Sequence, residues 1–392
     1  MIKMLYLTNI PTPYRNKRFN LMSEIFKDYN IDLTVYYMAE TESDRHWDVN
    51  LMNFSHKHFI DKGFYKNYKG IHWHFNPKLL KLIKKNNFEI VVVGGIASPT
   101  HWITPFLLRK NQCKILSVES NPFSEVRKSK AARVFKAKLL DKYDAFQVTG
   151  ERAVDYISQI SNESGQKTIL KLPNLIDEDS LMLTDKNKKE IRKQIRQRYQ
   201  IKDTEQLWVC PARLEPVKGL DIFLPSTKKL ENVKILVAGD GKEKNKLEDM
   251  VKTQKLPVEF LGHVDPNQMA NLYYSADLFV LPSIQDPSPL SPIEASYIGL
   301  PMLLSTRIGN FDDVFVEKKS KNNGWSFDPY NRKALSNILI EISKTNKDKL
   351  CDMGKLSKIN YEEKFNLENC LNNYAKQILK VSNDCNLQFV NS

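Results

Sequence analysis

The sequence ADLFVLPSIQDPSPLSPIEASYIGLPMLLST, from Ala276 to Thr306, decides the fold. Two apolar runs of strand length, Asp277–Ser283 and Pro301–Thr306, flank a proline-rich loop and one short helix. A strand, a helix and a second strand in this order predict parallel strands joined by a crossover helix. The loop carries Asp286, and the start of the helix carries Glu294, eight positions later.

The same alternation of strands and helices extends over most of the chain, which predicts an α/β fold with two doubly wound, Rossmann-like domains. Further strands are expected at Lys3–Thr8, Ile31–Tyr37, Phe88–Val93, Lys114–Val118 and Ala145–Thr149 in the first half, and at Gln206–Pro211, Val233–Ala238, Val258–Leu261 and Leu300–Ser305 in the second. Ligands of such sheets bind at the carboxyl ends of the strands.

Changes in composition set the expected domain boundaries. Residues 1–178 form the N-terminal domain, and residues 179–204, which are highly charged, form a linker and a helix that leads into the second domain. Residues 205–370 form the C-terminal domain. Residues 371–392 form a final helix and tail, which could pack back on the first domain.

The bulk composition is that of a soluble globular protein, with 41% hydrophobic and 27% charged residues among 392. No apolar run approaches the roughly 20 residues that span a bilayer, and the apolar N-terminal run is expected to be a buried strand and not a signal peptide. The five cysteines form no C-x-x-C pair, so a reducing cytoplasm is expected, without a disulfide framework or a zinc site. The pair His72 and His74 is expected to lie in a surface strand, so we expect no metal site and no cofactor.

The net charge of +13 favours an anionic partner. No pattern typical of a nucleic-acid-binding module is found, so nucleic acid is not expected. The helix expected at Ser124–Tyr143 has an apolar arc and a basic face, which suits the anionic inner face of a plasma membrane. Two other interpretations stay open: this helix packs on the sheet with a solvated lysine face, or a lysine-rich composition alone makes the chain basic.

Three loops follow strands of the second half and carry residues suited to a phosphorylated ligand. Arg213 and Lys218 place two cations in the first loop, where a diphosphate could bind. Gly241 ends an A-G-D-G turn in the second loop, which allows a close approach of the backbone. In the third, Glu294 could accept hydrogen bonds from ribose hydroxyls, or could merely complete a capping box with Ser291. Asp286 could likewise face a sugar or merely form a turn.

The order of these elements resembles the retaining glycosyltransferases of family four, also called glycosyl transferases group 1, which have the GT-B fold. That family has G-R-L-x-x-x-K-G, then G-x-G, then E-x-F-G-x-x-x-x-E-A-x-x-x-G-x-P. Here these patterns read P-A-R-L-E-P-V-K-G, A-G-D-G and D-P-S-P-L-S-P-I-E-A-S-Y-I-G-L-P. The resemblance is specific over about residues 207–310 and looser over the first half, where N-I-P-T-P-Y-R, Gly94-Gly95, V-E-S and Pro173-Asn174 carry it.

The resemblance implies a role for each matching residue. Arg213 and Lys218 would hold the diphosphate of a nucleotide sugar, Glu294 would bind the ribose, and Asp286 would face the sugar. The backbone around Leu261–His263 would frame the base. The reaction would be metal-independent, and the leaving phosphate would help to deprotonate the acceptor at the front face. The remaining donor-binding residues would be Gly241, His263, Ser288, Leu290 and Ser291.

Two departures from the family pattern fall in the third loop. Asp286 replaces a glutamate, and Ser288-Pro289 replaces a Phe-Gly pair. Because proline has no N–H, one hydrogen bond to the donor sugar would be absent or would come from Leu290 or Ser291 instead. We therefore expect an altered preference for the donor sugar.

The first domain would bind the acceptor, a glycan or a lipid-linked glycan of bacterial surface polysaccharide or lipopolysaccharide biosynthesis. The candidates on this side are Tyr14, Arg15, His101 and Glu119, although His101 could equally lie on a helix surface. Two alternatives stay open: a sugar-nucleotide epimerase with the GT-B fold, and a non-catalytic homologue that binds a sugar nucleotide or a glycan.

Overall fold

The computed structural model describes residues 1–43, 52–68, 71–124, 129–160, 167–318 and 321–390. The chain divides into two compact units, the first made of Met1–Leu175 and Leu367–Ser392 and the second of Ile176–Asn366. No described helix is long and apolar enough to cross a bilayer.

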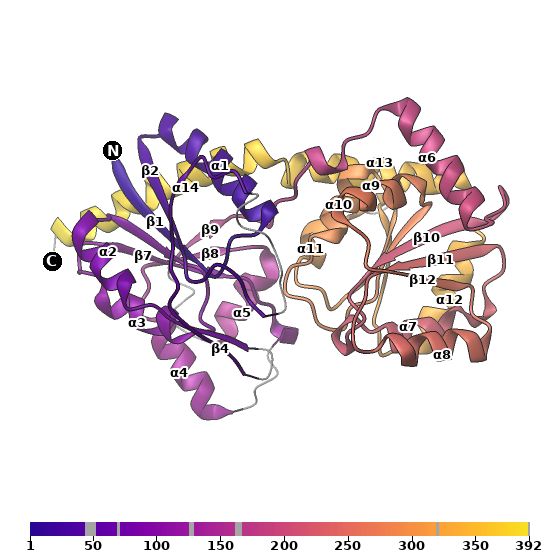
Figure 1. Ribbon diagram of the computed structural model, residues 1–392, viewed down its shortest axis with the longest axis horizontal. Coiled ribbons are helices and arrows are strands. Elements are labelled where there is room, and N and C mark those ends of the chain that lie inside the picture. Colours follow the sequence, from indigo (N-terminus) through magenta and orange to yellow (C-terminus); the bar gives the residue numbers. More distant parts are fainter. Residues whose placement is uncertain (44–51, 69–70, 125–128, 161–166, 319–320, 391–392) are drawn as a thin grey trace. The chain divides into compact units, whose positions relative to one another are not determined.

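The first unit is built on a parallel sheet in the order β3-β2-β1-β6-β7-β8-β9 (Figure 1). Its strands are β1 (Ile2–Thr8), β2 (Ile31–Tyr37), β3 (Lys57–Ile60), β6 (Ile90–Val93), β7 (Cys113–Val118), β8 (Ala145–Val148) and β9 (Thr168–Lys171). An antiparallel pair, β4 (Phe64–Tyr68) and β5 (Ile71–Phe75), lies outside this sheet.

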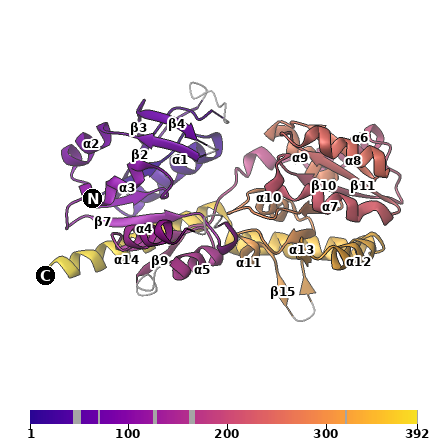
Figure 2. The ribbon, with the colours of Figure 1, turned by 90° about the horizontal axis from the view of Figure 1, so that it is seen from below.

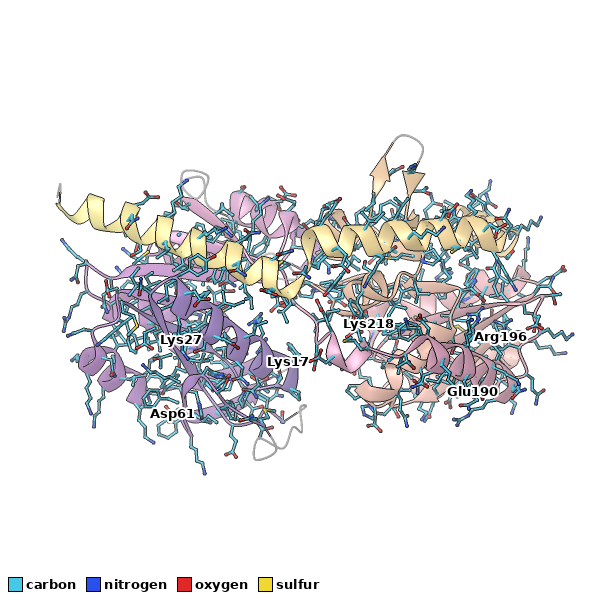
Figure 3. All side chains as sticks on the ribbon, turned by 90° about the horizontal axis from the view of Figure 1, so that it is seen from above. Lys17, Lys27, Asp61, Glu190, Arg196 and Lys218 are labelled. Carbon is cyan, nitrogen blue, oxygen red and sulfur yellow. The ribbon has the colours of Figure 1, made fainter. Side chains whose placement is uncertain are left out.

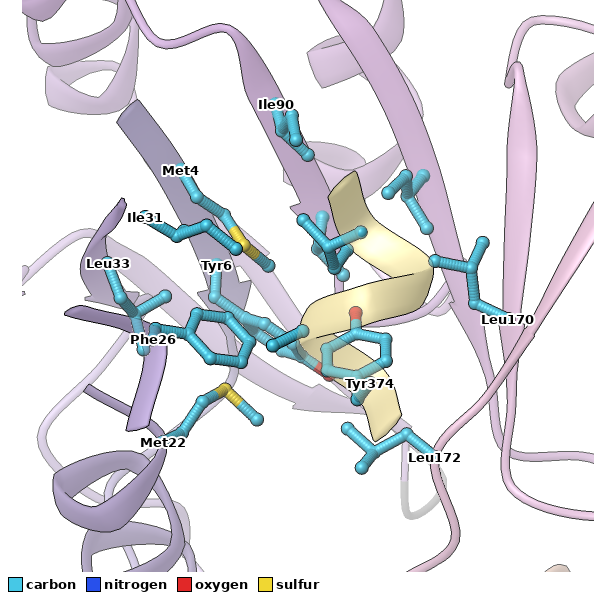
Figure 4. Packing of buried hydrophobic residues seen from close by; sticks show 14 of the residues in the cluster. Met4, Tyr6, Met22, Phe26, Ile31, Leu33, Ile90, Leu170, Leu172 and Tyr374 are labelled. Carbon is cyan, nitrogen blue, oxygen red and sulfur yellow. The ribbon is translucent and has the colours of Figure 1, made fainter. Parts of the chain in front are cut away.

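Helices cover both faces of the first sheet, as a doubly wound fold requires. Helices α1 (Pro13–Asp28) and α14 (Leu367–Val390) pack on one face, where Phe26 and Tyr374 meet in the core (Figure 4). The Tyr374 hydroxyl donates to Gln147 Oε1 at 2.6 Å, so the C-terminal helix satisfies a buried polar group of β8. The other face is covered by α2 (Lys78–Asn86), α3 (Pro99–Leu107), α4 (Lys130–Leu140) and α5 (Glu151–Ile160).

The second unit repeats the plan with a parallel sheet in the order β12-β11-β10-β13-β14-β17. Its strands are β10 (Gln206–Pro211), β11 (Val233–Ala238), β12 (Val258–Gly262), β13 (Leu278–Leu281), β14 (Met302–Ser305) and β17 (Gly324–Phe327). The short strands β15 (Glu317–Lys318) and β16 (Lys321–Asn322) pair away from it (Figure 2).

Helices again lie on both faces of this sheet (Figure 1). One face carries α9 (Pro266–Ser275) and α10 (Ser291–Ile298), and the other carries α7 (Leu220–Ser226), α8 (Lys244–Gln254) and α12 (Arg332–Ser343). The long α13 (Lys347–Lys364) supplies side chains to the cores on both faces, while α11 (Phe311–Val314) is a single turn.

The charged segment that was expected to link the domains forms α6 (Asp185–Arg198) and belongs to the second unit. Arg192 and Arg196, the latter labelled in Figure 3, reach Asp277 at 2.6 and 3.4 Å. Asp277 also accepts the Leu207 amide at 2.8 Å. The strongly polar sequence of α6 is therefore fixed by ion pairs at the start of β13.

The predicted fold class is confirmed, and several strands, including Ile31–Tyr37, Gln206–Pro211 and Val233–Ala238, begin and end where they were expected. The helix expected at Ser124–Tyr143 is wrong in extent. Pro122–Ser124 form a 3-10 turn, residues 125–128 lie outside the described part of the chain, and α4 spans only Lys130–Leu140, capped by Ser129. The strands β3, β4 and β17 were not expected from the local pattern.

Helix α13 holds α10 in place through a close contact between two glycines. A Cβ atom added to Gly354 would lie 2.1 Å from the carbonyl oxygen of Gly299, the residue that ends α10 with a φ of +86°. Because the obstructing atom belongs to the backbone, it cannot rotate aside.

We predict that Gly354→Ala destabilises the protein. Alanine favours a helix by about 1 kcal/mol over glycine, but overpacking a tight contact costs roughly 1–3 kcal/mol, and here the backbone must move. The midpoint of thermal unfolding should therefore fall. Cys351→Ala, at an exposed position of the same helix, is the control and should leave it unchanged. An unfolding midpoint of the Gly354 variant equal to that of the wild type would contradict the prediction.

Candidate active site

Three loops meet at the carboxyl-terminal end of the second sheet because their strands are neighbours. Strand β10 lies between β11 and β13, and all three run parallel. The loops that follow them start at Ala212, Gly239 and Pro282. The residues singled out in the sequence, although far apart along the chain, therefore project from one end of one sheet.

The first and third loops are held together by their backbones. The amides of Ile284 and Gln285 both donate to the Val217 carbonyl, at 3.0 and 3.1 Å. Gly219 has a φ of +66°, and a Cβ there would lie 2.5 Å from the Pro282 carbonyl oxygen. The glycine that ends the P-V-K-G turn is thus required by this close approach.

The contact between Lys218 and Asp286 joins the same two loops through their side chains. Lys218 Nζ lies 2.5 Å from Asp286 Oδ2, and both side chains are largely buried. The Asp286 carbonyl also accepts the Gly309 amide at 2.8 Å, which fixes the backbone of the carboxylate. An ammonium group has three donors, and this bond uses one. Arg213, the other expected cation, is exposed at the start of its loop.

The A-G-D-G turn packs against the first loop. The Leu214 amide donates to the Asp240 carbonyl at 2.9 Å, and a Cβ on Gly241 would lie 2.6 Å from the Leu214 carbonyl oxygen. His263 follows β12, is exposed, and lies 3.8 Å from Asp265. The close approach of the Leu214 carbonyl therefore explains why residue 241 is glycine. The His263 ring, in contrast, lies in solvent.

Glu294 does not form the capping box that the sequence allowed. The N-cap of α10 is Leu290, in a helical conformation and without a side-chain cap, and Ser291 is already in the helix. The Glu294 carboxylate instead accepts a hydrogen bond of 2.6 Å from the hydroxyl of Tyr273, a fully buried residue of α9. Burial raises the pKa of Glu294, and the bond from Tyr273 opposes that rise. Sequence reasoning missed Tyr273, because no spacing rule links it to Glu294.

The loop between the two acids is fixed at Pro289. Asn310 Nδ2 donates to the Pro289 carbonyl at 2.8 Å, and Ser288 is buried. The Leu290 carbonyl accepts the amides of Ile293 and Glu294. Among the described residues, no hydrogen-bond acceptor is found for the amides of Leu290 and Ser291. They are the donors that were expected to act in place of the N–H that Pro289 lacks.

In the first unit, the strand order β1-β6-β7 brings another set of candidates to one end of the sheet. Arg15 lies in the first turn of α1, with its guanidinium 5.8 Å from the Tyr14 ring centre. Burial alone would lower the pKa of Arg15, but the negative potential of Tyr14, Glu119 and other neighbours raises it. Glu119, just after β7, accepts a hydrogen bond from Asn174 Nδ2. Arg15 and Glu119 therefore lie within electrostatic reach of each other.

His101 is a buried residue, so the alternative of a helix-surface position is wrong. Its Nδ1 lies 3.3 Å from Ser98 Oγ, and no described residue offers a partner to its Nε2. Burial, together with the nearby His74, lowers the pKa of His101 to about 3, so the ring is neutral at neutral pH. A neutral imidazole with one unsatisfied nitrogen can donate or accept one hydrogen bond from a ligand.

His74 is buried against Glu42, with Nε2 and Oε1 3.0 Å apart. Its neighbours in β5, Trp73 and Phe75, are exposed, so the strand lies at the surface as expected while the His74 side chain is buried. Within the described chain, a cluster with metal-compatible donors is Cys113, Asp144 and Cys385. The two sulfur atoms are 2.8 Å apart, whereas two thiolates on one tetrahedral zinc are separated by about 3.8 Å. This arrangement fits a thiol contact between β7 and α14, and not a zinc site.

Part of the chain matches a known protein family. Residues 191–358 match the family described as "Glycosyl transferases group 1". An uncharacterized glycosyltransferase of Methanocaldococcus jannaschii, MJ1607, is 29% identical over 132 residues, which is 32% of this chain and 33% of that protein. The sulfoquinovosyl transferase SQD2 of Arabidopsis thaliana is 30% identical over 117 residues, 30% of this chain and 22% of that protein. The alignments thus span a third or less of the relatives.

The fold is the GT-B fold, with two Rossmann-like units. The crystal structure of HepE from Anabaena, in complex with UDP-glucose, superimposes with a TM-score of 0.72 over 97% of this chain and all of that one. The sequence identity is 14%, so this likeness establishes the architecture.

We predict that Glu294→Gln stabilises the protein without ligand at pH 8. A carboxylate whose pKa is raised on folding opposes folding increasingly as the pH rises from the unfolded value, about 4.3, through the folded one. Glutamine keeps an acceptor for Tyr273 but carries no charge. The gain in unfolding temperature should therefore be larger at pH 8 than at pH 5.

The matched control is Glu363→Gln, an exposed glutamate of the same unit, which should give no gain at either pH. Scanning fluorimetry at the two pH values measures the effect. If the shift in unfolding temperature of Glu294→Gln is the same at the two pH values, or is negative at both, burial of this carboxylate does not oppose folding.

Proposed function

We propose that this chain is a retaining glycosyltransferase of family four. It would move a sugar from a nucleotide-diphosphate sugar to a glycan or lipid-linked acceptor in the assembly of a bacterial surface polysaccharide, such as lipopolysaccharide, or of a glycoconjugate. The match of residues 191–358 to glycosyl transferases group 1 supports this proposal. So does the GT-B fold shared with a protein whose crystal structure contains UDP-glucose.

The observation that carries the proposal is the joint placement of two cations and two carboxylates at one end of the second sheet. Lys218 and Asp286 are paired between adjacent loops, Arg213 lies in the same loop as Lys218, and Glu294 lies in the first turn of α10. Cations held by neighbouring loops suit a diphosphate. The partly buried carboxylate, oriented by Tyr273, suits vicinal ribose hydroxyls.

The proposed chemistry is stabilisation of the leaving group. When the bond to the sugar breaks, negative charge grows on the diphosphate, and Arg213 and Lys218 stabilise it without reorganisation. The amides of Leu290 and Ser291 lie at the start of a helix, where negative charge is favoured. The acceptor oxygen forms its bond to the anomeric carbon on the face from which the diphosphate leaves, and the leaving phosphate takes the proton of that oxygen. Attack at this face gives retention. Protein cations supply the positive charge, so the proposal includes no metal and no cofactor.

The first unit provides the acceptor side in this proposal. Tyr14, Arg15, His101 and Glu119 follow the carboxyl-terminal ends of β1, β6 and β7. Neutral His101 would hydrogen-bond a hydroxyl of one of the substrates through Nε2. The proposed location is the cytoplasm, at the inner face of the plasma membrane, to which the basic helix α4 would bind peripherally.

We predict that Lys218→Ala strongly reduces both donor binding and transfer. A thermal-shift screen with UDP-, GDP-, ADP- and dTDP-sugars should reveal at least one that raises the unfolding temperature of the wild type. That shift should be lost in the variant, and transfer should fall by about 10²–10³-fold, because one preorganised charge is removed. Lys252→Ala, on the exposed surface of α8, is the matched control.

The outcomes separate the proposal from its alternatives. An unchanged turnover of the Lys218 variant would refute the site. Donor binding with neither transfer nor hydrolysis would identify a non-catalytic binding protein. Conversion of the donor without any acceptor, followed by product analysis, would identify an epimerase.

We predict that Asp286→Asn strengthens the binding of the free nucleoside diphosphate but weakens sugar transfer. Loss of the carboxylate removes a negative charge near the proposed diphosphate site and releases Lys218, so the free nucleoside diphosphate should bind several-fold more tightly. Transfer should fall, because the carboxylate no longer contacts the sugar. Calorimetry and turnover measure the two effects, with the exposed Asp249→Asn as control. A loss of both nucleoside diphosphate affinity and turnover would show instead that Asp286 mainly orients Lys218.

A further inference from the structure

The first unit contains a pocket of about 660 Å³ beneath α4. This volume is within the range of small-molecule sites. It is lined by the end of β7 and by the Gly94–Ala97 turn after β6. Helix α4 contributes Ala132, Phe135 and Lys136, and α5 contributes Tyr156. All these residues belong to one unit and to the described part of the chain.

Three aromatic rings from three different elements form the wall of this pocket. Trp73 and Trp102 meet edge to face with ring centres 5.6 Å apart, and Trp102 meets Phe135 in the same way at 5.5 Å. The indole N–H of Trp102 donates to the Ile96 carbonyl at 2.8 Å, so its polar atom is satisfied and its ring presents an apolar surface. Trp73 and Phe135 are nevertheless 37% and 48% exposed. Large half-exposed rings at the mouth of a pocket are typical of a binding surface.

The polar groups of the pocket lie where an anionic head group could be held. Lys136 Nζ is 3.1 Å from the Tyr156 hydroxyl. Along Lys130–Leu140, α4 carries four basic residues and no acidic one. The apolar side chains Val134 on α4 and Phe106 on α3 are also exposed, at 55% and 64%. The surroundings therefore match a hydrocarbon with negative charge at one end.

The pocket also reaches the proposed acceptor site. Glu119 and Ser120, at the end of β7, and Gly95, after β6, line it. Gly95 is also close to His101: a Cβ on it would lie 3.9 Å from the His101 ring. A molecule that fills the pocket would thus extend to the strand ends that carry the acceptor candidates.

We propose that this pocket binds the hydrocarbon chain of a lipid-linked acceptor, with its phosphate near Lys136. The proposal rests on the proposed function, because it identifies the acceptor of that reaction as a polyisoprenyl- or acyl-type phosphate. A single ligand of this kind accounts for both the half-exposed aromatic rings and the basic surface of α4. Such a pocket selects a chain, whereas a basic helix face by itself would select only negative charge.

Two adjacent alanines of α4 provide a matched test. Ala132 lines the pocket, whereas Ala131 is exposed. Calorimetry with farnesyl phosphate should show binding to the wild type and to Ala131→Phe. Binding to Ala132→Phe should be about tenfold weaker, because the new ring displaces roughly two methylene groups of the ligand. Equal affinity of the two phenylalanine variants would overturn the proposal.

Other ligands and a second variant distinguish recognition of the hydrocarbon chain from recognition of the negative charge. Farnesol should bind more weakly than farnesyl phosphate, and inorganic phosphate should not compete at equal concentration. Lys136→Gln, which leaves the pocket walls intact, should reduce the affinity for farnesyl phosphate to that for farnesol. Competition by inorganic phosphate at equal concentration would overturn the proposal. Circular dichroism and unfolding temperature establish that each variant is folded.

Two further measurements show whether the hydrocarbon chain belongs to an acceptor or to a membrane lipid, and they test this inference independently of the proposed function. Vesicles of phosphatidylglycerol should bind the wild type and Ala132→Phe equally. Weaker vesicle binding by Ala132→Phe would show that a bulk membrane lipid fills the pocket, which contradicts an acceptor site. Nucleotide sugars should raise the unfolding temperature of the wild type and of Ala132→Phe equally. If the wild type binds no nucleotide sugar, the proposed function fails, whereas loss of chain binding alone refutes only this inference.

Discussion

Close backbone packing between the loops at the end of the second sheet is the constraint on which the proposed donor site depends. Val217 receives two amides of the loop after β13, and Gly219 fits against Pro282 only because it has no side chain. This packing brings Lys218 to Asp286. Charges placed in this way need little reorganisation when a ligand develops charge, which is the property that electrostatic catalysis requires.

Glu294 illustrates the conflict between stability and ligand recognition. Burial opposes its ionisation, and a single bond from Tyr273 offsets only part of that cost. A structural cap would be better served by a serine or asparagine exposed at the helix start. The observed arrangement gives the helix no such cap, since Leu290 occupies the N-cap position. Helix capping therefore does not explain why this carboxylate is buried, and its burial is consistent with the proposed contact to a ligand.

Periodicity predicted the α/β fold and most strands, because buried parallel strands are short apolar runs that local patterns reveal. The polar order Arg213, Lys218, Asp286 and Glu294 likewise predicted the candidate site, since parallel strands bring their ends together. Features set by tertiary packing were not predictable. Tyr273 contacts Glu294 because α9 and α10 pack on the same face of the sheet, and Cys113 contacts Cys385 because α14 packs on β7. The false capping box shows the same limit, because Ser291 has the right residue type but already lies inside α10.

The contacts of the proline loop determine how it could select a donor. Pro289 removes one amide, but its carbonyl accepts a hydrogen bond from Asn310, so the loop is fixed at Pro289 as well as at the Lys218–Asp286 pair. A loop held at both ends cannot adapt to sugars of different shape by moving. Its remaining amides, Leu290 and Ser291, therefore lie at fixed positions relative to Asp286. Discrimination between donors would then follow from where a sugar places its hydroxyls, and not from closure of the loop around it.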